Sequence, residues 1–320
     1  MKQININQLI DFKLGNATNS KDATGCTVIV AIDGATAGVD VRGGGPATRE
    51  TDLLKSENMV QQIHAVTLSG GSAFGLEASD GVMHYLSEHN IGFDMKGIYI
   101  PIVCGASLFD CSVGNVKAYP TKQMGYDACK NAFEHNVIDM GNVGAGTGAS
   151  VGKMLGFDKA MKTGLGYSAA QLNDLQVGSI VAVNAVGDVF EPNSNTAIAG
   201  IYDKEKQTRL FTEDIILSSD SIQSNPIANT TIACIITNAN LTKAQANKLA
   251  SMAHDAYAHT IRPVHTSNDG DTIFTMCSNK VAADLDVVAL LAVKVLEQAI
   301  VNACKNAQPA YDLPSFISLQ

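Results

Sequence analysis

The sequence predicts an α/β protein in which buried strands alternate with amphipathic helices. Two stretches carry this prediction. Residues 232–236 (Ile-Ala-Cys-Ile-Ile) form a short apolar run between polar residues, which is typical of a strand buried on both faces. Residues 60–86 contain an apolar strand, a glycine turn and a helix whose apolar residues recur at helical spacing.

Composition limits the class of protein. The length of 320 residues allows one large domain or two small ones, and 46% hydrophobic residues supply a large core. Only 17% of the residues are charged, so we expect part of the surface to be covered in a homo-oligomer. The net charge is -9 and no Lys/Arg-rich run occurs, which argues against nucleic acid and anionic membranes as partners.

The chain carries no evident targeting or metal-binding pattern. Residues 1–9 lack a signal-peptide core, and no apolar run approaches the ~20 residues of a membrane span. The seven cysteines are scattered without a CxxC pair, and the histidines lack ligand spacing. We therefore expect a cytoplasmic protein with reduced, buried thiols, without a metal or another cofactor.

In the first third of the chain, residues 25–32 are expected to form a strand and residues 34–41 its hairpin partner. The glycine-rich residues 42–49 suit either a flexible surface loop or a ligand-facing loop. After strand 60–68, Gly70, Gly71 and Ser72 lead into a helix. The free N–H groups of this turn suit an anion or oxyanion, unless Ser72 simply caps them.

In the middle third, residues 121–135 predict a helix, and residues 141–153 are the most glycine-dense stretch. This stretch does not match a P-loop, because Thr147 replaces the first glycine and Met154 follows the lysine. It predicts a tight backbone loop that delivers Lys153. Asn184 lies inside the apolar run 177–190, where its amide needs hydrogen bonds.

The last third begins with a connector. Residues 203–223 are charged without strong periodicity, and with residues 218–226 they predict an exposed segment in which a cut would be tolerated. Thr242 is expected to cap a helix over residues 241–261. A polar loop over 265–272, a strand over 273–277 and a long helix over 284–304 complete the chain.

Thr230 stands at the mouth of the central strand, directly after Asn229. A β-hydroxyl at this place can attack the preceding carbonyl, and hydrolysis of the resulting ester would leave Thr230 as a new N-terminus. Its hydroxyl could then act as a nucleophile with its own amine as the base. The alternative is an ordinary polar turn that leads into a strand.

Several further segments match one family in order along nearly the whole chain. They are 69–82 (SGGSAFGLEASDGV), 101–103 (PIV), 143–148 (VGAGTG), 183–187 (VNAVG), 229–232 (NTTI), 237–239 (TNA) and 262–272 (RPVHTSNDGDT). In these segments the chain resembles the L-aminopeptidase/D-esterase (DmpA) family, which includes nylon-oligomer hydrolases. The resemblance implies one domain with a layered α/β/β/α fold of the N-terminal-nucleophile type, as in ornithine acetyltransferases. It also implies self-cleavage into residues 1–229 and 230–320, which stay together.

The resemblance also implies roles for particular residues. Thr230 would be the nucleophile, Asn184 the oxyanion-side asparagine, Lys153 the lysine of the nylon-hydrolase branch, and Asp269 with Asp271 its acidic pair. One departure is Phe109, which stands where some members have a tyrosine, so other groups must supply that oxyanion contact.

These features lead us to expect a self-processed hydrolase that cleaves amide or ester bonds of short peptides, amino-acid amides or related oligomers through an acyl-Thr230 intermediate. Two alternatives remain. One is an acyltransferase of the ornithine acetyltransferase type, although the extended motif that precedes the threonine of those enzymes is not recognisable here. The other is a non-catalytic relative that keeps the fold as a binding protein.

Overall fold

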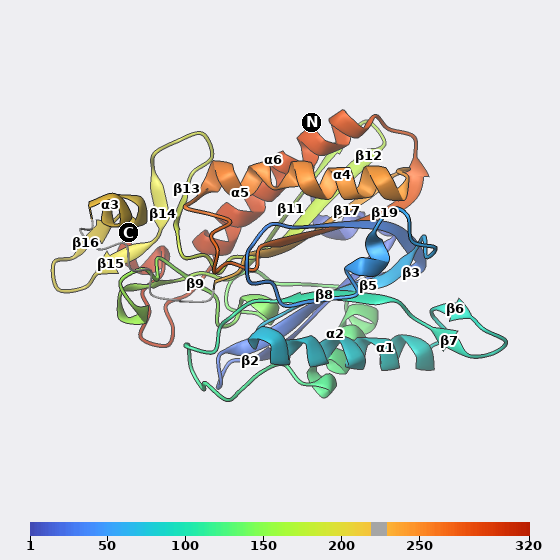
Figure 1. Cartoon of the computed structure of the whole chain (residues 1–320), viewed down its shortest axis with the longest axis horizontal. Coiled ribbons are helices and arrows are strands. Elements are labelled where there is room, and N and C mark those ends of the chain that lie inside the picture. Colours follow the sequence, from blue (N-terminus) through green and yellow to red (C-terminus); the bar gives the residue numbers. More distant parts are fainter. Residues whose placement is uncertain (219–228) are drawn as a thin grey trace.

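The computed structural model describes residues 1–218 and 229–320, and it places two sheets face to face between two groups of helices (Figure 1). The first sheet has the strand order β1-β11-β12-β17-β19-β3. In the second, β5 lies between β3 and β8, β4 pairs with β8, and β2 pairs with β3. Their bounds are β1 Lys2–Ile4, β2 Phe12–Asn19, β3 Thr24–Val41, β4 Thr48–Arg49, β5 Ile63–Ser69, β8 Val103–Ser107, β11 Leu165–Leu172, β12 Leu175–Ala182, β17 Ile232–Ala239 and β19 Thr272–Val281.

Strand β3 belongs to both sheets, which corrects the predicted hairpin. Its first half pairs with β2 and β5, and its second half pairs with β19. The pairing register shifts between Val30 and Ala35, and Gly34 adopts a left-handed φ of 77°. Glycine tolerates this conformation, so the chain bends there and continues as a strand instead of turning back.

Successive side chains of each central strand pack alternately between the two sheets and against the helices. In β3, Ile29 faces the other sheet, whereas Val28 and Val30 face the helices. In β17, Cys234 lies between the sheets and Ile235 faces the helices over the first sheet.

Helices cover the outer face of each sheet (Figure 1). The first sheet is covered by α4 (Lys243–Ala253), α5 (Asp255–Thr260) and α6 (Leu285–Lys305), and the second by α1 (Ala78–Glu88) and α2 (Lys122–Glu134). This stacking confirms the expected α/β/β/α sandwich.

Several expected elements have different bounds. The predicted helix over residues 241–261 is two helices, α4 and α5, which meet at His254, and Thr242 caps α4 through a capping box. The predicted connector contains structure up to residue 218, namely β15, β16 and a short helix, α3. Its remainder, residues 219–226, lies outside the described residues.

The remaining elements are short strands and the helix α3. Their bounds are β6 Phe93–Asp94, β7 Tyr99–Ile100, β9 Ser150–Val151, β10 Met161–Lys162, β13 Asp188–Phe190, β14 Ala197–Ala199, β15 Ile201–Asp203, β16 Thr208–Leu210, α3 Thr212–Ser218 and β18 Ile261–Arg262.

Helix α6 is the longest helix among the described residues, and charged residues interrupt its apolar positions. It has 21 residues with a mean hydropathy of 1.8, so by length and composition it could cross a membrane. However, 67% of its most apolar stretch is buried, and it packs on β11 and β12. Asp284 caps its first turn, as expected for the start of a core helix.

Candidate active site

The site lies where β17 and β19 begin. These two strands are parallel neighbours in the first sheet, so the residues that precede them meet at the same edge. Asn229 and Asp269 form a bridge at this edge, and Thr230 follows, with only 4% of its surface exposed. The sheet topology thus brings the Asn229–Thr230 peptide against the loop over residues 265–271.

Three hydrogen bonds surround the Asn229–Thr230 peptide bond. The Thr230 hydroxyl donates to the Asn229 carbonyl, and the Gly270 N–H donates to the same oxygen at 2.9 Å. The Thr230 N–H donates to the Asn184 carbonyl at 3.0 Å. Gly270 also makes room, because a Cβ on it would lie 2.7 Å from Thr230 Oγ1.

Lys153 and Asn184 form one side of the site. Lys153 is fully buried, and its Nζ donates to Asn184 Oδ1 at 2.9 Å and to the Asn184 carbonyl at 3.2 Å. Desolvation lowers the pKa of Lys153 to about 7, although Asp269, Asp110 and Asp271 oppose this shift. Its hydrogen bonds therefore go to Asn184, while the aspartates act on it through charge.

The Asn184 side chain is held at both ends. Its Oδ1 also accepts the Ser150 N–H at 3.1 Å, and its Nδ2 donates to the Phe109 carbonyl at 3.0 Å. The amide that the sequence predicted inside an apolar run is thus fixed by hydrogen bonds. These link the lysine loop, the Phe109 segment and Thr230.

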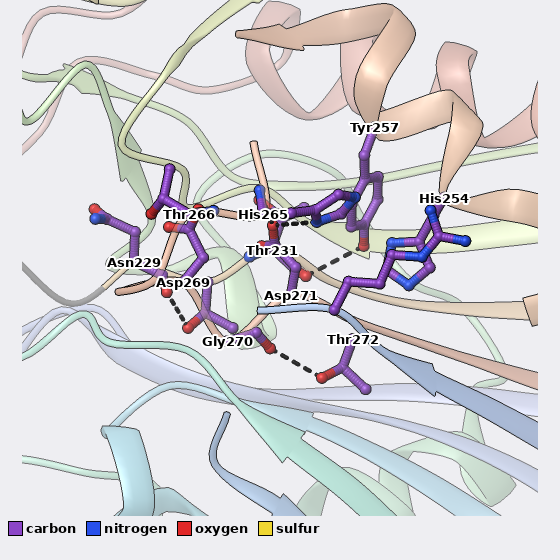
Figure 2. Close-up of polar contacts among 12 residues, drawn as sticks. Asn229, Thr231, His254, Tyr257, His265, Thr266, Asp269, Gly270, Asp271 and Thr272 are labelled. Atoms are coloured by element: carbon purple, nitrogen blue, oxygen red, sulfur yellow. Dashed lines mark hydrogen bonds and ion pairs between the residues drawn. The ribbon is translucent and has the colours of Figure 1, made fainter. Parts of the chain in front are cut away.

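The two aspartates form the other side (Figure 2). Asp269 Oδ2 accepts the Thr266 N–H at 2.6 Å, and Asp271 Oδ1 accepts the Thr231 N–H at 2.7 Å. Desolvation, followed by the charge of Asp271, raises the pKa of Asp269 to about 6. The Asp269 carboxylate therefore holds the start of the loop that leads to Gly270, and the Asp271 carboxylate holds the backbone just after Thr230.

The glycine-rich loop at residues 42–45 supports this acidic loop from outside. The Gly45 N–H donates to the Asp269 carbonyl at 2.7 Å, and the Arg42 N–H donates to the Asp271 carbonyl at 3.0 Å. A Cβ on Gly43 would lie 2.2 Å from the Asp269 carbonyl oxygen. Gly43 therefore permits this close approach of two backbones, which a side chain would block.

The Gly70–Gly71–Ser72 turn does not have the free N–H groups predicted for it. These N–H groups donate to the Gly25 carbonyl, Asp110 Oδ1 and the Leu108 carbonyl, at 2.9, 2.7 and 2.9 Å. Ser72 is not the cap either, because the following 3-10 helix has Gly71 at its N-cap without a side-chain bond. Asp110 takes the donor that an oxyanion would need.

A pocket of about 480 Å³ lies beside this turn. It is mostly apolar and is lined by Gly71, Ser72, Ala73, Phe74, Phe109, Cys111, Val116, Lys117, Ala118 and Tyr119. Through the Phe109 carbonyl, the pocket wall is bonded to Asn184. The turn therefore contributes to the wall of a cavity next to the site.

The structure gathers Asn229, Thr230, Asn184, Lys153 and the Asp269/Asp271 pair around one peptide bond. Sequence reasoning missed Gly270, although it stands between the two aspartates, and it left His265 among the lone histidines. Among the described residues, no group of three or more His, Cys, Asp or Glu side chains could hold a metal ion.

The layered α/β/β/α fold is shared with solved structures of peptide and amide hydrolases. The chain belongs to peptidase family S58, whose model matches residues 7–312. This confirms the resemblance to the DmpA family.

Relatives and solved structures agree with this assignment. The chain is 40% identical over 269 residues to an uncharacterized aminopeptidase of Mycobacterium leprae, covering 82% of this chain and 72% of that protein. It is 31% identical over 274 residues to a 6-aminohexanoate-oligomer endohydrolase of Paenarthrobacter ureafaciens, covering 84% and 73%. The L-aminopeptidase D-Ala-esterase/amidase of Ochrobactrum anthropi shares the fold, with a TM-score of 0.67, 16% identity, and coverage of 93% and 84%.

Proposed function

We propose that this protein is a self-processing hydrolase that uses Thr230 as an N-terminal nucleophile to cleave amide bonds of short peptides or related oligomers. One observation carries the proposal. The Thr230 hydroxyl contacts the carbonyl of the residue before it, and the Gly270 N–H donates to that same carbonyl oxygen. This places a nucleophile and an oxyanion donor at one peptide bond.

Self-cleavage follows from these contacts. Thr230 Oγ1 attacks the Asn229 carbonyl carbon, and the negative charge that develops on the oxygen is stabilised by the Gly270 N–H. The C–N bond breaks, the hydroxyl proton passes to the departing nitrogen, and an ester joins Asn229 to Thr230. Water then hydrolyses the ester, which gives an Asn229 carboxylate and a free Thr230 amine and hydroxyl.

Substrate hydrolysis repeats the chemistry with a new carbonyl. The Thr230 amine has an ordinary pKa of about 7.7–8.0, so it can accept the hydroxyl proton near neutral pH. Oγ1 forms an ester with the acyl group of the substrate, and the proton leaves with the amine product. Water hydrolyses the acyl-Thr230 ester and restores the enzyme.

The two flanking pairs would support both stages. Asn184 Nδ2 has a second hydrogen that can donate to the oxyanion, which offsets the missing tyrosine at Phe109. Lys153 donates to the same Asn184 carbonyl oxygen that accepts the Thr230 N–H, so it would fix that carbonyl and act on the site through it. Asp269 and Asp271 would orient the new amine.

The pocket beside Phe109 supports the substrate class. Its apolar lining suits a hydrocarbon segment, as in an apolar amino acid or a 6-aminohexanoate unit, and Lys117 adds a positive charge to the wall. We place such a substrate chain in this pocket. We further propose that the enzyme works as a homo-oligomer of cleaved chains in the cytoplasm, where its cysteines stay reduced.

The test compares the wild type with Thr230→Ala and Thr230→Ser on amino-acid p-nitroanilides, dipeptides and 6-aminohexanoate oligomers. The wild type should cleave between residues 229 and 230 and hydrolyse at least one of these amides. Thr230→Ser keeps a hydroxyl and should retain both activities in reduced form. Thr230→Ala should lose both, and full amide hydrolysis by this variant would refute the mechanism.

A further inference from the structure

His265 lies directly behind the aspartate that holds the nucleophile strand. Its ring Nδ1 is 2.9 Å from Asp271 Oδ2, and its own backbone N–H donates to the same oxygen at 3.1 Å. The other oxygen of Asp271 accepts the Thr231 N–H at 2.7 Å. A continuous set of hydrogen bonds therefore runs from the His265 ring to the residue that follows Thr230 (Figure 2).

The chemistry of Asp271 determines the tautomer of His265. An ionised carboxylate only accepts hydrogen bonds, so the ring nitrogen that faces it must carry the hydrogen. Asp271 then receives two donors on Oδ2 and one on Oδ1, which fixes the carboxylate in one orientation. A carboxylate held in this way cannot turn away from the Thr231 amide.

The surroundings of the ring keep it in place. It packs against the His254 ring at 4.8 Å and the Tyr257 ring at 5.9 Å between centroids, and the Tyr257 hydroxyl donates to the Thr231 carbonyl at 3.2 Å. His265 also has a left-handed φ of 58°, which non-glycine residues adopt only where the surrounding structure holds them. Both donors of this constrained residue converge on one carboxylate oxygen.

We propose that His265 is a positioning residue, which clamps Asp271 and offsets its negative charge so that the Thr230 amine stays a usable base. This inference rests on the proposed function. Asp271 without a partner would favour the ammonium form of a nearby amine and remove the base near neutral pH. His265 acts through Asp271 and does not touch the reacting atoms.

Titratable and charged groups from several elements face the His265–Asp271 pair. Asp269 lies before β19 and Lys153 follows β9. His254 and Tyr257 lie on the α4–α5 side, Asp40 lies in β3, and Arg42 follows it. Burial lowers the pKa of His254 to about 4, although its hydrogen bond with the Asp40 backbone acts in the opposite direction. His254 therefore stays neutral near pH 7, and His265 is the histidine that acts on Asp271.

Two variants that both tolerate a left-handed backbone distinguish loss of the ring N–H donor from disturbance of the fold. His265→Gly removes the ring donor, whereas His265→Asn keeps an N–H donor on a residue type that tolerates this conformation. His259→Asn is the matched control, because His259 pairs with Glu297 and contacts none of the site residues named above. Each protein is measured for its rate of self-cleavage after refolding and for the pH profile of kcat/KM on alanine p-nitroanilide.

We expect His265→Gly to slow self-cleavage and kcat by ~10- to ~100-fold, the range for loss of a charge-assisted hydrogen bond. The acid limb of its kcat/KM profile should move to higher pH, because unshielded Asp271 raises the pKa of the amine. His265→Asn should recover most of the rate, and the control should match the wild type.

The outcomes distinguish the inference from the function beneath it. A wild type that neither cleaves nor hydrolyses overturns the proposed function and this role with it. A wild type that does both, while His265→Gly keeps its rates and pH profile, overturns only the role of His265. Loss in His265→Gly without recovery in His265→Asn also overturns it, because the donor would then not be the cause.

Discussion

The two sides of the Asn229–Thr230 bond are built in different ways. The acidic side, residues 265–271, is one continuous loop that holds the carbonyl through Gly270 and the next amide through Asp271. The basic side, Lys153 and Asn184, joins two segments that lie 31 residues apart and holds the Thr230 N–H through a carbonyl. The acidic side comes from one short segment of the chain, whereas the basic side combines two segments that are distant in the sequence.

Burial acts on both sides with opposite results for charge. It raises the pKa of Asp269 to about 6 and lowers that of Lys153 to about 7. Desolvation disfavours either charged form, so both groups change charge close to neutral pH. The acidic side therefore holds the peptide through its own backbone N–H and carboxylates, whereas the basic side holds it through the Asn184 carbonyl, which a buried lysine fixes.

The largest effect is expected on the acidic side, from Gly270→Ala. The added methyl group would lie 2.7 Å from Thr230 Oγ1, so the hydroxyl or the loop must move. Self-cleavage should fall by at least ~10³-fold, comparable to the loss of an oxyanion donor and its geometry. Gly45→Ala is the matched control, because its Cβ would lie 3.8 Å from the nearest atoms. Equal cleavage of the two variants, followed by intact mass over time, would contradict the acidic-side geometry.

A comparison of Lys153, on the basic side, with a second buried lysine, Lys162, distinguishes an effect on catalysis from an effect on stability. Lys153→Met should slow turnover by about 10²-fold with little loss of stability, because Asn184 O and Oδ1 keep the Thr230 and Ser150 donors. Lys162 is equally buried, and its Nζ donates to the Gly146 and Ala149 carbonyls at 3.0 Å and also to the Thr163 carbonyl.

Lys162→Met should therefore lower the free energy of unfolding by about 1–3 kcal/mol. Denaturant unfolding and steady-state kinetics of both variants make the test. Equal losses of activity and stability in the two variants would remove the distinction between these lysines.

The pH dependence of stability provides a further test. Burial lowers the pKa of Lys153 from its ordinary 10.5 to about 7, so between these values the folded chain binds fewer protons than the unfolded chain. The free energy of unfolding should then rise with pH across this window, by up to about 1.4 kcal/mol per pH unit. Lys162 acts in the same direction, since its pKa is also lowered to about 7.

The measurement is urea unfolding at pH 8 to 10 in Thr230→Ala, which is expected to remain one intact chain. Adding Lys153→Met should reduce the slope and leave the part that Lys162 contributes. An unchanged slope in the double variant would mean that Lys153 does not carry this titration.

The smallest effect is expected outside both sides, in the pocket beside Phe109. Ala73→Leu fills part of the pocket and should raise KM for substrates with a bulky apolar chain by roughly 3- to 10-fold, with kcat nearly unchanged. Ala244→Leu, at an exposed position of α4, is the control. If both variants keep the wild-type KM for every substrate, the apolar chain of the substrate does not bind in this pocket.

Local patterns predicted much of the fold. The apolar run at 232–236 is the buried centre of β17, and capping threonines mark the starts of α2 and α4. The hairpin at residues 25–41 was wrong, because Gly34 looked like a turn and only the pairing of β3 with two different sheets shows that it is a bend.

The site was predictable to a different extent on its two sides. The roles of Asp269, Asp271, Lys153 and Asn184 all came from the family resemblance, but only the two aspartates stand together in one loop of the sequence. The Gly70–Ser72 turn was misread because Asp110, which takes the Gly71 N–H, lies 39 residues further along the chain. His265 was missed because its bond to Asp271 depends on the folded shape of the loop.

The most direct test of the central claim is the intact mass of the purified wild type under denaturing conditions, beside Thr230→Ala. The account predicts two wild-type species of roughly 24 and 10 kDa, estimated from their share of the chain length, with the smaller one starting at Thr230. Thr230→Ala should remain a single chain of 33.6 kDa. A wild type that stays at 33.6 kDa after long incubation, or a Thr230→Ala chain cut at the same bond, would contradict it.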